Sequence, residues 1–278
     1  METFDADWLA LREPIDHRSR AEALIAPLCE TWRARGWSRV LDLGSGAGAN
    51  LRYLASRLPA GQGWVLVDHD PDHLRTLEHA EVPASVRSLR IVPGDLVHEG
   101  LAAIPHADLV TASALLDLVS EDWLRRVVDA CAVAARGAHF ALSYDGEIRW
   151  SADGEPGGQG EEDPDDALVR DAVNAHQTGD KGLGPALGSA AGVVAERLFR
   201  RARYTTQLLP SPWRLGAADA PLVRRLIAGW EAAAATLRPA DAGRIHAWAE
   251  RRRATVAAGR FTLRVGHRDL LALPPEGS

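Results

Sequence analysis

The stretch Val40-Leu41-Asp42-Leu43-Gly44-Ser45-Gly46-Ala47-Gly48 is the strongest indication of the fold in this sequence. Its apolar first half is typical of a buried strand in a parallel sheet. Its glycines allow the backbone to turn tightly and to approach a ligand without clashes from Cβ atoms. Apolar residues from Leu51 to Leu58 then recur at helical spacing, and such a helix would direct its first N–H groups at that ligand. The stretch therefore predicts a strand, a ligand-binding loop and a helix in succession.

Outward from this stretch, short apolar runs alternate with amphipathic helices. The runs expected as further strands lie at 64–67, 89–92, 107–112, 138–143, 204–209 and 261–265. Strands that alternate with helices indicate right-handed βαβ units and a parallel sheet covered on both faces. The sequence thus predicts an α/β protein with a Rossmann-like sheet.

The chain is expected to form a single domain over residues 1–278, because its length and composition fit one large globular unit. Ser151 to Asp166 holds seven acidic residues, four glycines and no large apolar side chain, so it is expected to be a mobile surface loop. A helix is expected to begin near Pro164. The remaining divisions are two N-terminal helices within 1–35, separated at Pro14, a core over 36–145, and a helical insertion over 215–259.

Composition disfavours several classes of function. The net charge of −6 provides no field that would attract nucleic acid. No stretch reaches the roughly 18 apolar residues that a membrane span needs, and no signal peptide is visible at the N-terminus. The two cysteines, Cys29 and Cys131, lie far apart in the sequence. A cytoplasmic protein without disulfides, nucleic-acid partner or membrane partner is expected.

Three acidic residues stand at the ends of three predicted strands. Asp42 lies two residues before the first glycine, where a carboxylate favours an ammonium group and opposes a pyrophosphate. Asp68 lies 20 residues after Gly48, where nucleotide-binding sheets accept ribose hydroxyls. Asp95 in Gly94-Asp95-Leu96 could accept a hydrogen bond from an adenine amine. The spacing predicts a nucleoside site at this edge of the sheet.

With these motifs, the chain resembles the class I S-adenosylmethionine-dependent methyltransferases. Val40–Gly48 resembles their first motif, Val67-Asp68 their second-strand acid, Gly94-Asp95-Leu96 their adenine-contacting segment, and Ala107–Leu116 their fourth-strand motif. The resemblance implies a seven-stranded, mostly parallel sheet with an antiparallel last strand, and S-adenosylmethionine as cofactor. The residues it implies for cofactor binding are Asp42, Gly44, Ser45, Gly46, Gly48, Asp68, His69, Asp95, Leu96 and Ser113.

The resemblance also predicts where an acceptor would bind. Because strand six ends and strand seven begins at the carboxyl edge, the two helices within 215–259 should project over the cofactor as a cap. Ligands of open α/β sheets bind outside the carboxyl ends of the strands. This rule selects Asp117 as a catalytic candidate, and Tyr144, Trp213 and Arg214 as substrate-binding candidates. The loop from His176 to Lys181 could fold back over the site, so His176 is a second catalytic candidate and Lys181 a further substrate-binding candidate. A small-molecule acceptor is expected, and nothing in the sequence requires a metal.

Two other functions remain open. A protein of this fold could bind S-adenosylmethionine as a sensor or partner subunit without transferring a methyl group. Gly44 to Ala49 also satisfies the GxGxxA pattern of nicotinamide-dependent oxidoreductases. Asp42 and the missing second nucleotide-binding half disfavour this last interpretation. The sequence leaves the acceptor and the oligomeric state open.

Overall fold

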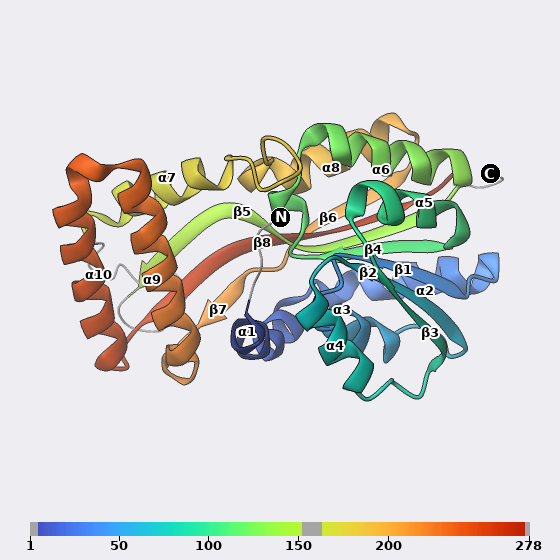
Figure 1. Ribbon diagram of the computed structural model, residues 1–278, viewed down its shortest axis with the longest axis horizontal. Coiled ribbons are helices and arrows are strands. Elements are labelled where there is room, and N and C mark those ends of the chain that lie inside the picture. The colour runs from blue at the N-terminus through green and yellow to red at the C-terminus, as the bar shows by residue number, and fades with distance from the viewer. Residues whose placement is uncertain (1–4, 152–162, 276–278) are drawn as a thin grey trace.

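The computed structural model describes residues 5–151 and 163–275. They form one mixed sheet with helices packed on both faces (Figure 1). Its strands are β1 (Arg39–Leu43), β2 (Gln62–Asp68), β3 (Val86–Pro93), β4 (Leu109–Ser113), β5 (Gly137–Ser151), β6 (Thr205–Pro210), β7 (Trp213–Leu215) and β8 (Thr262–Leu273). Residues 152–162 of the expected mobile loop lie outside the described residues.

The strand order confirms the predicted fold class. The sheet runs β3-β2-β1-β4-β5-β8-β6. From β3 to β5 neighbouring strands are parallel, whereas β8 lies antiparallel between β5 and β6. One further short strand, β7, pairs with β8. The sequence did not indicate β7, because Pro210 and Pro212 directly precede it and proline is typical of strand ends.

Alternation along the strands creates two cores, one on each face of the sheet. In β1, Val40 faces a core shared with α2 (Ile25–Arg35), α3 (Ala49–Ala55) and α4 (Pro71–His79). Its neighbour Leu41 faces the other core, shared with α6 (Glu121–Ala134) and α8 (Ala191–Arg201), beside which lies the short α5 (Leu101–Ala103). This placement leaves the carboxyl ends of the strands as the edge where loops can meet a ligand.

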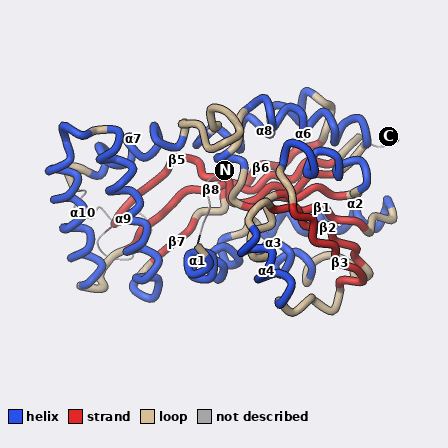
Figure 2. Tube along the Cα trace, in the orientation of Figure 1, coloured by secondary structure: helices blue, strands red, loops and turns tan. Residues whose placement is uncertain are grey.

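A third core lies at one end of the molecule. The distal half of β5, together with β7 and the first half of β8, packs against α7 (Asp166–Gln177), α9 (Ala220–Leu237) and α10 (Ala242–Ala257). Figure 2 shows α9 and α10 side by side beyond the tips of these strands. None of the helices within residues 5–151 and 163–275 is long and apolar enough to cross a membrane.

One predicted boundary was wrong, and another is shifted by two residues. The N-terminal helix α1 (Ala6–Ser19) continues through Pro14 and ends at Ser19, and the backbone of the following Arg20 is extended. Proline removes only one helical hydrogen bond, and α1 gains packing because its buried Ile15 joins the third core. The helix expected to begin near Pro164 begins at Asp166. Asp163 lies before it, in an ion pair with Arg251.

Candidate active site

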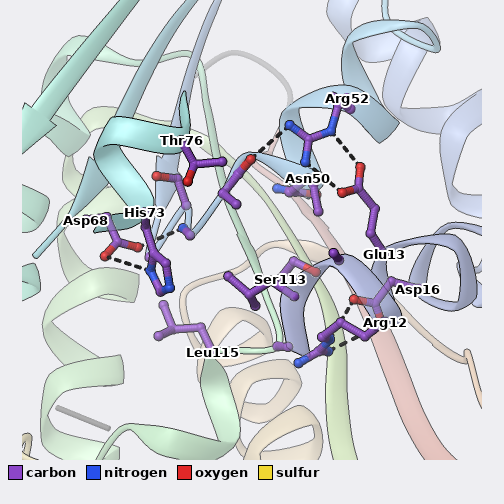
Figure 3. Close-up of a pocket in the computed structure, with 18 of the residues that line it drawn as sticks. Arg12, Glu13, Asp16, Asn50, Arg52, Asp68, His73, Thr76, Ser113 and Leu115 are labelled. Atoms are coloured by element: carbon purple, nitrogen blue, oxygen red, sulfur yellow. Dashed lines mark hydrogen bonds and ion pairs between the residues drawn. The ribbon is translucent and has the colours of Figure 1, made fainter. Parts of the chain in front are cut away.

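A cavity of about 230 Å³ lies between the glycine loop and α1, at the carboxyl ends of β1, β2 and β4 (Figure 3). We call it the glycine-loop pocket. It contains six of the predicted cofactor residues, namely Gly44, Ser45, Gly46, Asp68, His69 and Ser113. Besides Arg12, six further polar residues that the sequence did not predict for the cofactor site line it, namely Glu13, Asp16, Asn50, Arg52, His73 and Thr76. All six come from α1, α3 and α4, so their convergence depends on helix packing.

The glycine loop is held open toward this pocket by Asp68. Gly44 and Gly46 have left-handed backbones with φ of 64° and 51°, which glycine adopts without strain. The Gly46 N–H donates to Asp68 Oδ2 at 2.7 Å, and the Asp70 N–H donates to Asp68 Oδ1 at 2.9 Å. If Gly46 carried a Cβ atom, only Leu9 Cδ1 among the described residues would lie within 4 Å of it. The backbone at Gly46 therefore faces open space.

His69 and His73 flank Asp68. The Nδ1 atoms of His69 and His73 lie 3.6 and 3.8 Å from Asp68 Oδ1. His73 is buried and lines the pocket. Within residues 5–151 and 163–275, no group of three or more His, Cys, Asp or Glu side chains could hold a metal ion.

Arg52 fastens α1 over the pocket. Its Nε and Nη2 donate to the two carboxylate oxygens of Glu13 at 2.6 and 2.7 Å, and its Nη1 donates to the Ala47 carbonyl at 2.8 Å. This bidentate contact joins α1 to the glycine loop. The sequence predicted that the helices of 215–259 would cover the cofactor, but in the structure α1 covers the glycine-loop pocket. The long β5 and β8 carry α9 and α10 farther away (Figure 1).

Asp42 does not reach the pocket. Its side chain is 1% exposed, and its Oδ1 accepts hydrogen bonds from Asn50 Nδ2 at 2.7 Å and Thr111 Oγ1 at 2.8 Å. Its Oδ2 has no hydrogen-bond partner among the described residues. Burial raises the pKa of Asp42 to about 6, because the charged form loses its hydration. Asp42 is thus a buried support beneath the glycine loop.

Replacing Asp42 by Asn should remove a pH dependence of folding stability. The pKa of Asp42 is about 6 in the folded protein against an ordinary 3.8, so folding favours its protonated form. This contribution is fully present below pH 4 and is lost as the pH rises to 6, at a cost on the order of 3 kcal/mol. In urea unfolding from pH 4 to 7, the Asp42→Asn variant should gain stability relative to the wild type up to pH 6. A constant difference between the two proteins would contradict this prediction.

Three other predicted cofactor residues also lie outside the pocket. Gly48 begins α3 with φ of 85°, and a Cβ there would collide with Leu77 of α4. Asp95 turns away to accept hydrogen bonds from the backbone N–H groups of Val97 and His98. Its neighbour Leu96 is buried in the core with α6. An acidic residue after a strand can cap the following helical turn, and Asp95 does so.

A second cavity of about 260 Å³ adjoins the first. We call it the aromatic pocket, because its walls include Trp8, Tyr144, Trp213, Trp230 and His267. The two cavities share three lining residues, Arg12, Ala114 and Leu118. One side is formed by α9, so the insertion lies over this cavity. The two cavities therefore adjoin at these shared residues.

The predicted catalytic and substrate-binding residues mostly converge on the aromatic pocket. Asp117, His176, Tyr144, Lys181 and Trp213 line it. Arg214 does not, because side chains alternate along β7 and place Arg214 on the exposed face between the buried Trp213 and Leu215. Two tryptophans of α9 and α10 differ in position: Trp230 lines the pocket, whereas Trp248 is buried elsewhere and donates to Asp166.

Arg12 stands at the junction of the two pockets. Its Nε donates to Asp16 Oδ2 at 2.8 Å, and its guanidinium carbon lies 5.1 Å from the ring centre of Trp213. Trp213 Nε1 donates to the other oxygen of Asp16 at 2.9 Å. These contacts fix the aromatic wall against α1.

A buried carboxylate holds the backbone around the aromatic pocket. Asp269 is fully buried. It accepts hydrogen bonds from the Leu142 N–H at 2.8 Å, the Ser211 hydroxyl at 2.5 Å and the Ala21 N–H at 2.9 Å. Arg20 Nε lies 3.3 Å from its Oδ2. Leu142 lines the pocket with φ of 53°, a conformation that a non-glycine residue keeps only when its surroundings enforce it.

No family model matches the chain, and no curated protein matches it. Among solved structures, the chain is similar to human N-acetylserotonin methyltransferase in complex with SAM, with 15% identity, 71% of this chain and 48% of that chain covered, and a TM-score of 0.41. It is also similar to the YcgJ protein of Bacillus subtilis, with 13% identity and a TM-score of 0.46. That match covers 92% of this chain and 100% of the YcgJ chain. A third similar structure is an arsenic(III) S-adenosylmethionine methyltransferase from Chlamydomonas reinhardtii, with 16% identity and a TM-score of 0.41. That match covers 86% of this chain and 64% of the algal chain. The chain thus spans about half the length of the human enzyme. At these identities the similarity concerns the fold alone.

Proposed function

We propose that the protein is an S-adenosylmethionine-dependent methyltransferase that acts on a small molecule. The observation that carries the proposal is the pairing of two adjoining cavities, the glycine-loop pocket and the aromatic pocket, across Arg12, Ala114 and Leu118. A group-transfer enzyme needs its donor and its acceptor held at contact distance in a fixed orientation. This arrangement provides two separate sites that meet at one junction.

The residues of the glycine-loop pocket fit S-adenosylmethionine. The Asp68 carboxylate at the end of β2 lies where ribose hydroxyls are accepted in sheets of this kind. The open backbone at Gly46 allows close approach of a ligand. Ser45 Oγ is buried and has no hydrogen-bond partner among the described residues, so a polar group of a ligand would satisfy it. The cofactor would supply an activated methyl group at the junction.

The chain's own part in the reaction is to bind, align and exclude water. Methyl transfer is a displacement in line, so positioning can supply much of the rate enhancement. The aromatic walls would hold an acceptor by its apolar surface. Asp117 and His176 line the same cavity and would accept a proton from an acceptor that must lose one.

The proposal is tested by titration calorimetry followed by a transfer assay. The purified protein should bind S-adenosylmethionine and S-adenosylhomocysteine, whereas NADH should not bind. With tritium in the donor methyl group, label should then enter a small-molecule fraction of a cell extract. The Trp230→Ala variant should keep cofactor binding and lose most of the transfer, because Trp230 lines only the aromatic pocket.

The alternatives give different results in the same experiment. A sensor or partner subunit would bind the sulfonium cofactor and its product without incorporating label into any fraction. A nicotinamide-dependent oxidoreductase would bind NADH and neither sulfur compound. Either pattern would overturn the proposed function.

A further inference from the structure

A histidine that the sequence did not single out stands in the aromatic pocket. His267 lies on β8 directly opposite Tyr144 of β5. Its ring centre is 4.8 Å from that of Trp213 and 6.1 Å from that of Tyr144. His267 is 6% exposed and lines the pocket. The imidazole therefore stands between two aromatic walls, where an acceptor would lie.

The hydrogen bonding of His267 fixes which ring nitrogen can meet a ligand. Its Nδ1 lies 3.1 Å from the carbonyl oxygen of Val265. A carbonyl only accepts, so Nδ1 carries the hydrogen and the neutral ring keeps a lone pair on Nε2. Burial, with Arg12 as the second cause, lowers the pKa of His267 to about 3, so the ring stays neutral near pH 7.

Three donor groups near His267 form hydrogen bonds with other residues. Trp213 Nε1 donates to Asp16 at 2.9 Å, and the Tyr144 hydroxyl donates to Asn174 Oδ1 at 2.7 Å. Arg12 directs its Nε to Asp16 at 2.8 Å. Within residues 5–151 and 163–275, no side chain donates a hydrogen bond to His267 Nε2. A ligand that left this acceptor unsatisfied would forfeit binding free energy.

We infer that His267 selects the acceptor: the aromatic pocket takes a flat aromatic molecule that presents a hydroxyl or N–H donor to His267 Nε2. This inference rests on the proposed function, because it names the acceptor class of the same site. Trp213 and Tyr144 contact the ring of such a molecule, and His267 Nε2 accepts a hydrogen bond from the donor on its edge. A carboxylate at that position would face the lone pair of Nε2 and would be rejected. His267 is thus a specificity-determining residue that receives a hydrogen bond.

The test measures binding of three probes that share one ring system. Calorimetry with quinoline, 7-hydroxyquinoline and quinoline-7-carboxylate is carried out in the presence of saturating S-adenosylhomocysteine. For the wild type, the hydroxyl should improve the dissociation constant about tenfold over quinoline, which is the size of one net hydrogen bond. The carboxylate should bind more weakly than either. In the His267→Phe variant, the hydroxyl advantage should disappear while quinoline binding stays within about twofold.

Two variants control for loss of structure. His79→Phe replaces an exposed histidine at the end of α4 that lines neither pocket. This variant should keep the wild-type ratio of the dissociation constants of quinoline and 7-hydroxyquinoline. His267→Gln retains an acceptor side chain and should keep part of the advantage. If the hydroxyl advantage survives in His267→Phe, or if the carboxylate binds best, the inference is wrong and the cations of the pocket decide selection. Failure of S-adenosylhomocysteine to bind would instead overturn the proposed function. The ratio of the dissociation constants of quinoline and 7-hydroxyquinoline, measured without S-adenosylhomocysteine, would still test His267.

Discussion

The Asp269→Ala variant is expected to lose about 3 to 5 kcal/mol of folding free energy, because it leaves a buried charge without its partner. The Arg20 side chain is 2% exposed, and Asp269 is the carboxylate with which it pairs. The substitution also removes the acceptor of the N–H groups of Leu142 and Ala21 and of the Ser211 hydroxyl. Urea unfolding followed by far-UV circular dichroism measures the loss.

Two further variants distinguish the loss of the Asp269 contacts from the general effect of removing a carboxylate on folding stability. Asp129→Ala removes an exposed carboxylate from α6 and should change stability by less than about 0.5 kcal/mol. The double variant Arg20→Met with Asp269→Ala should recover part of the loss, since neither charge then remains buried alone. A loss below about 1 kcal/mol for Asp269→Ala would show that the buried pair does not organise these segments.

The Asp68→Ala variant is expected to weaken binding of S-adenosylmethionine by about 100-fold, the second large effect. Two ribose hydroxyls would lose a charged acceptor, and hydrogen bonds to charged groups contribute about 1.5 to 3 kcal/mol each. The variant also frees the Gly46 N–H from its 2.7 Å contact. Titration calorimetry with S-adenosylhomocysteine, which carries the same ribose, should show the same loss.

Asp68→Asn separates the two roles of this residue. Its amide oxygen can still accept from Gly46, so the loop should stay in place while affinity falls only about tenfold. Asp72→Ala, at an exposed position on α4, is the matched control and should bind as the wild type does. Unchanged affinity in Asp68→Ala, with the wild type binding, would remove Asp68 from the cofactor site.

The sequence was sufficient for the sheet and for one side of the site. Val40–Gly48 and the alternating strands and helices specify the fold through local patterns, because the period of apolar residues and the placement of glycines are properties of neighbours in the chain. Ligands of such sheets bind at the carboxyl ends of the strands. This rule alone brought Asp68, Ser113, Asp117 and Tyr144 to the two pockets.

The sequence could not show whether an acidic residue at the end of a strand faces a ligand or bonds to the protein itself. Asp42, Asp68 and Asp95 each follow the pattern of a strand-end carboxylate, yet only Asp68 lines the glycine-loop pocket. Asp42 is sequestered by Asn50 and Thr111, and Asp95 caps the turn that follows it. The outcome depends on which hydrogen-bond donors the tertiary structure brings near each carboxylate.

Local patterns in the sequence were enough to predict every strand except β7, the glycine loop and the edge where ligands bind. The cover of the glycine-loop pocket by α1 through Glu13 and Arg52, and the placement of His267 opposite Tyr144, depend instead on tertiary packing. Antiparallel pairing of β8 with β5 places His267 opposite Tyr144, and its register is fixed by packing between residues far apart in the chain. A contact that depends on such packing leaves no local pattern in the sequence.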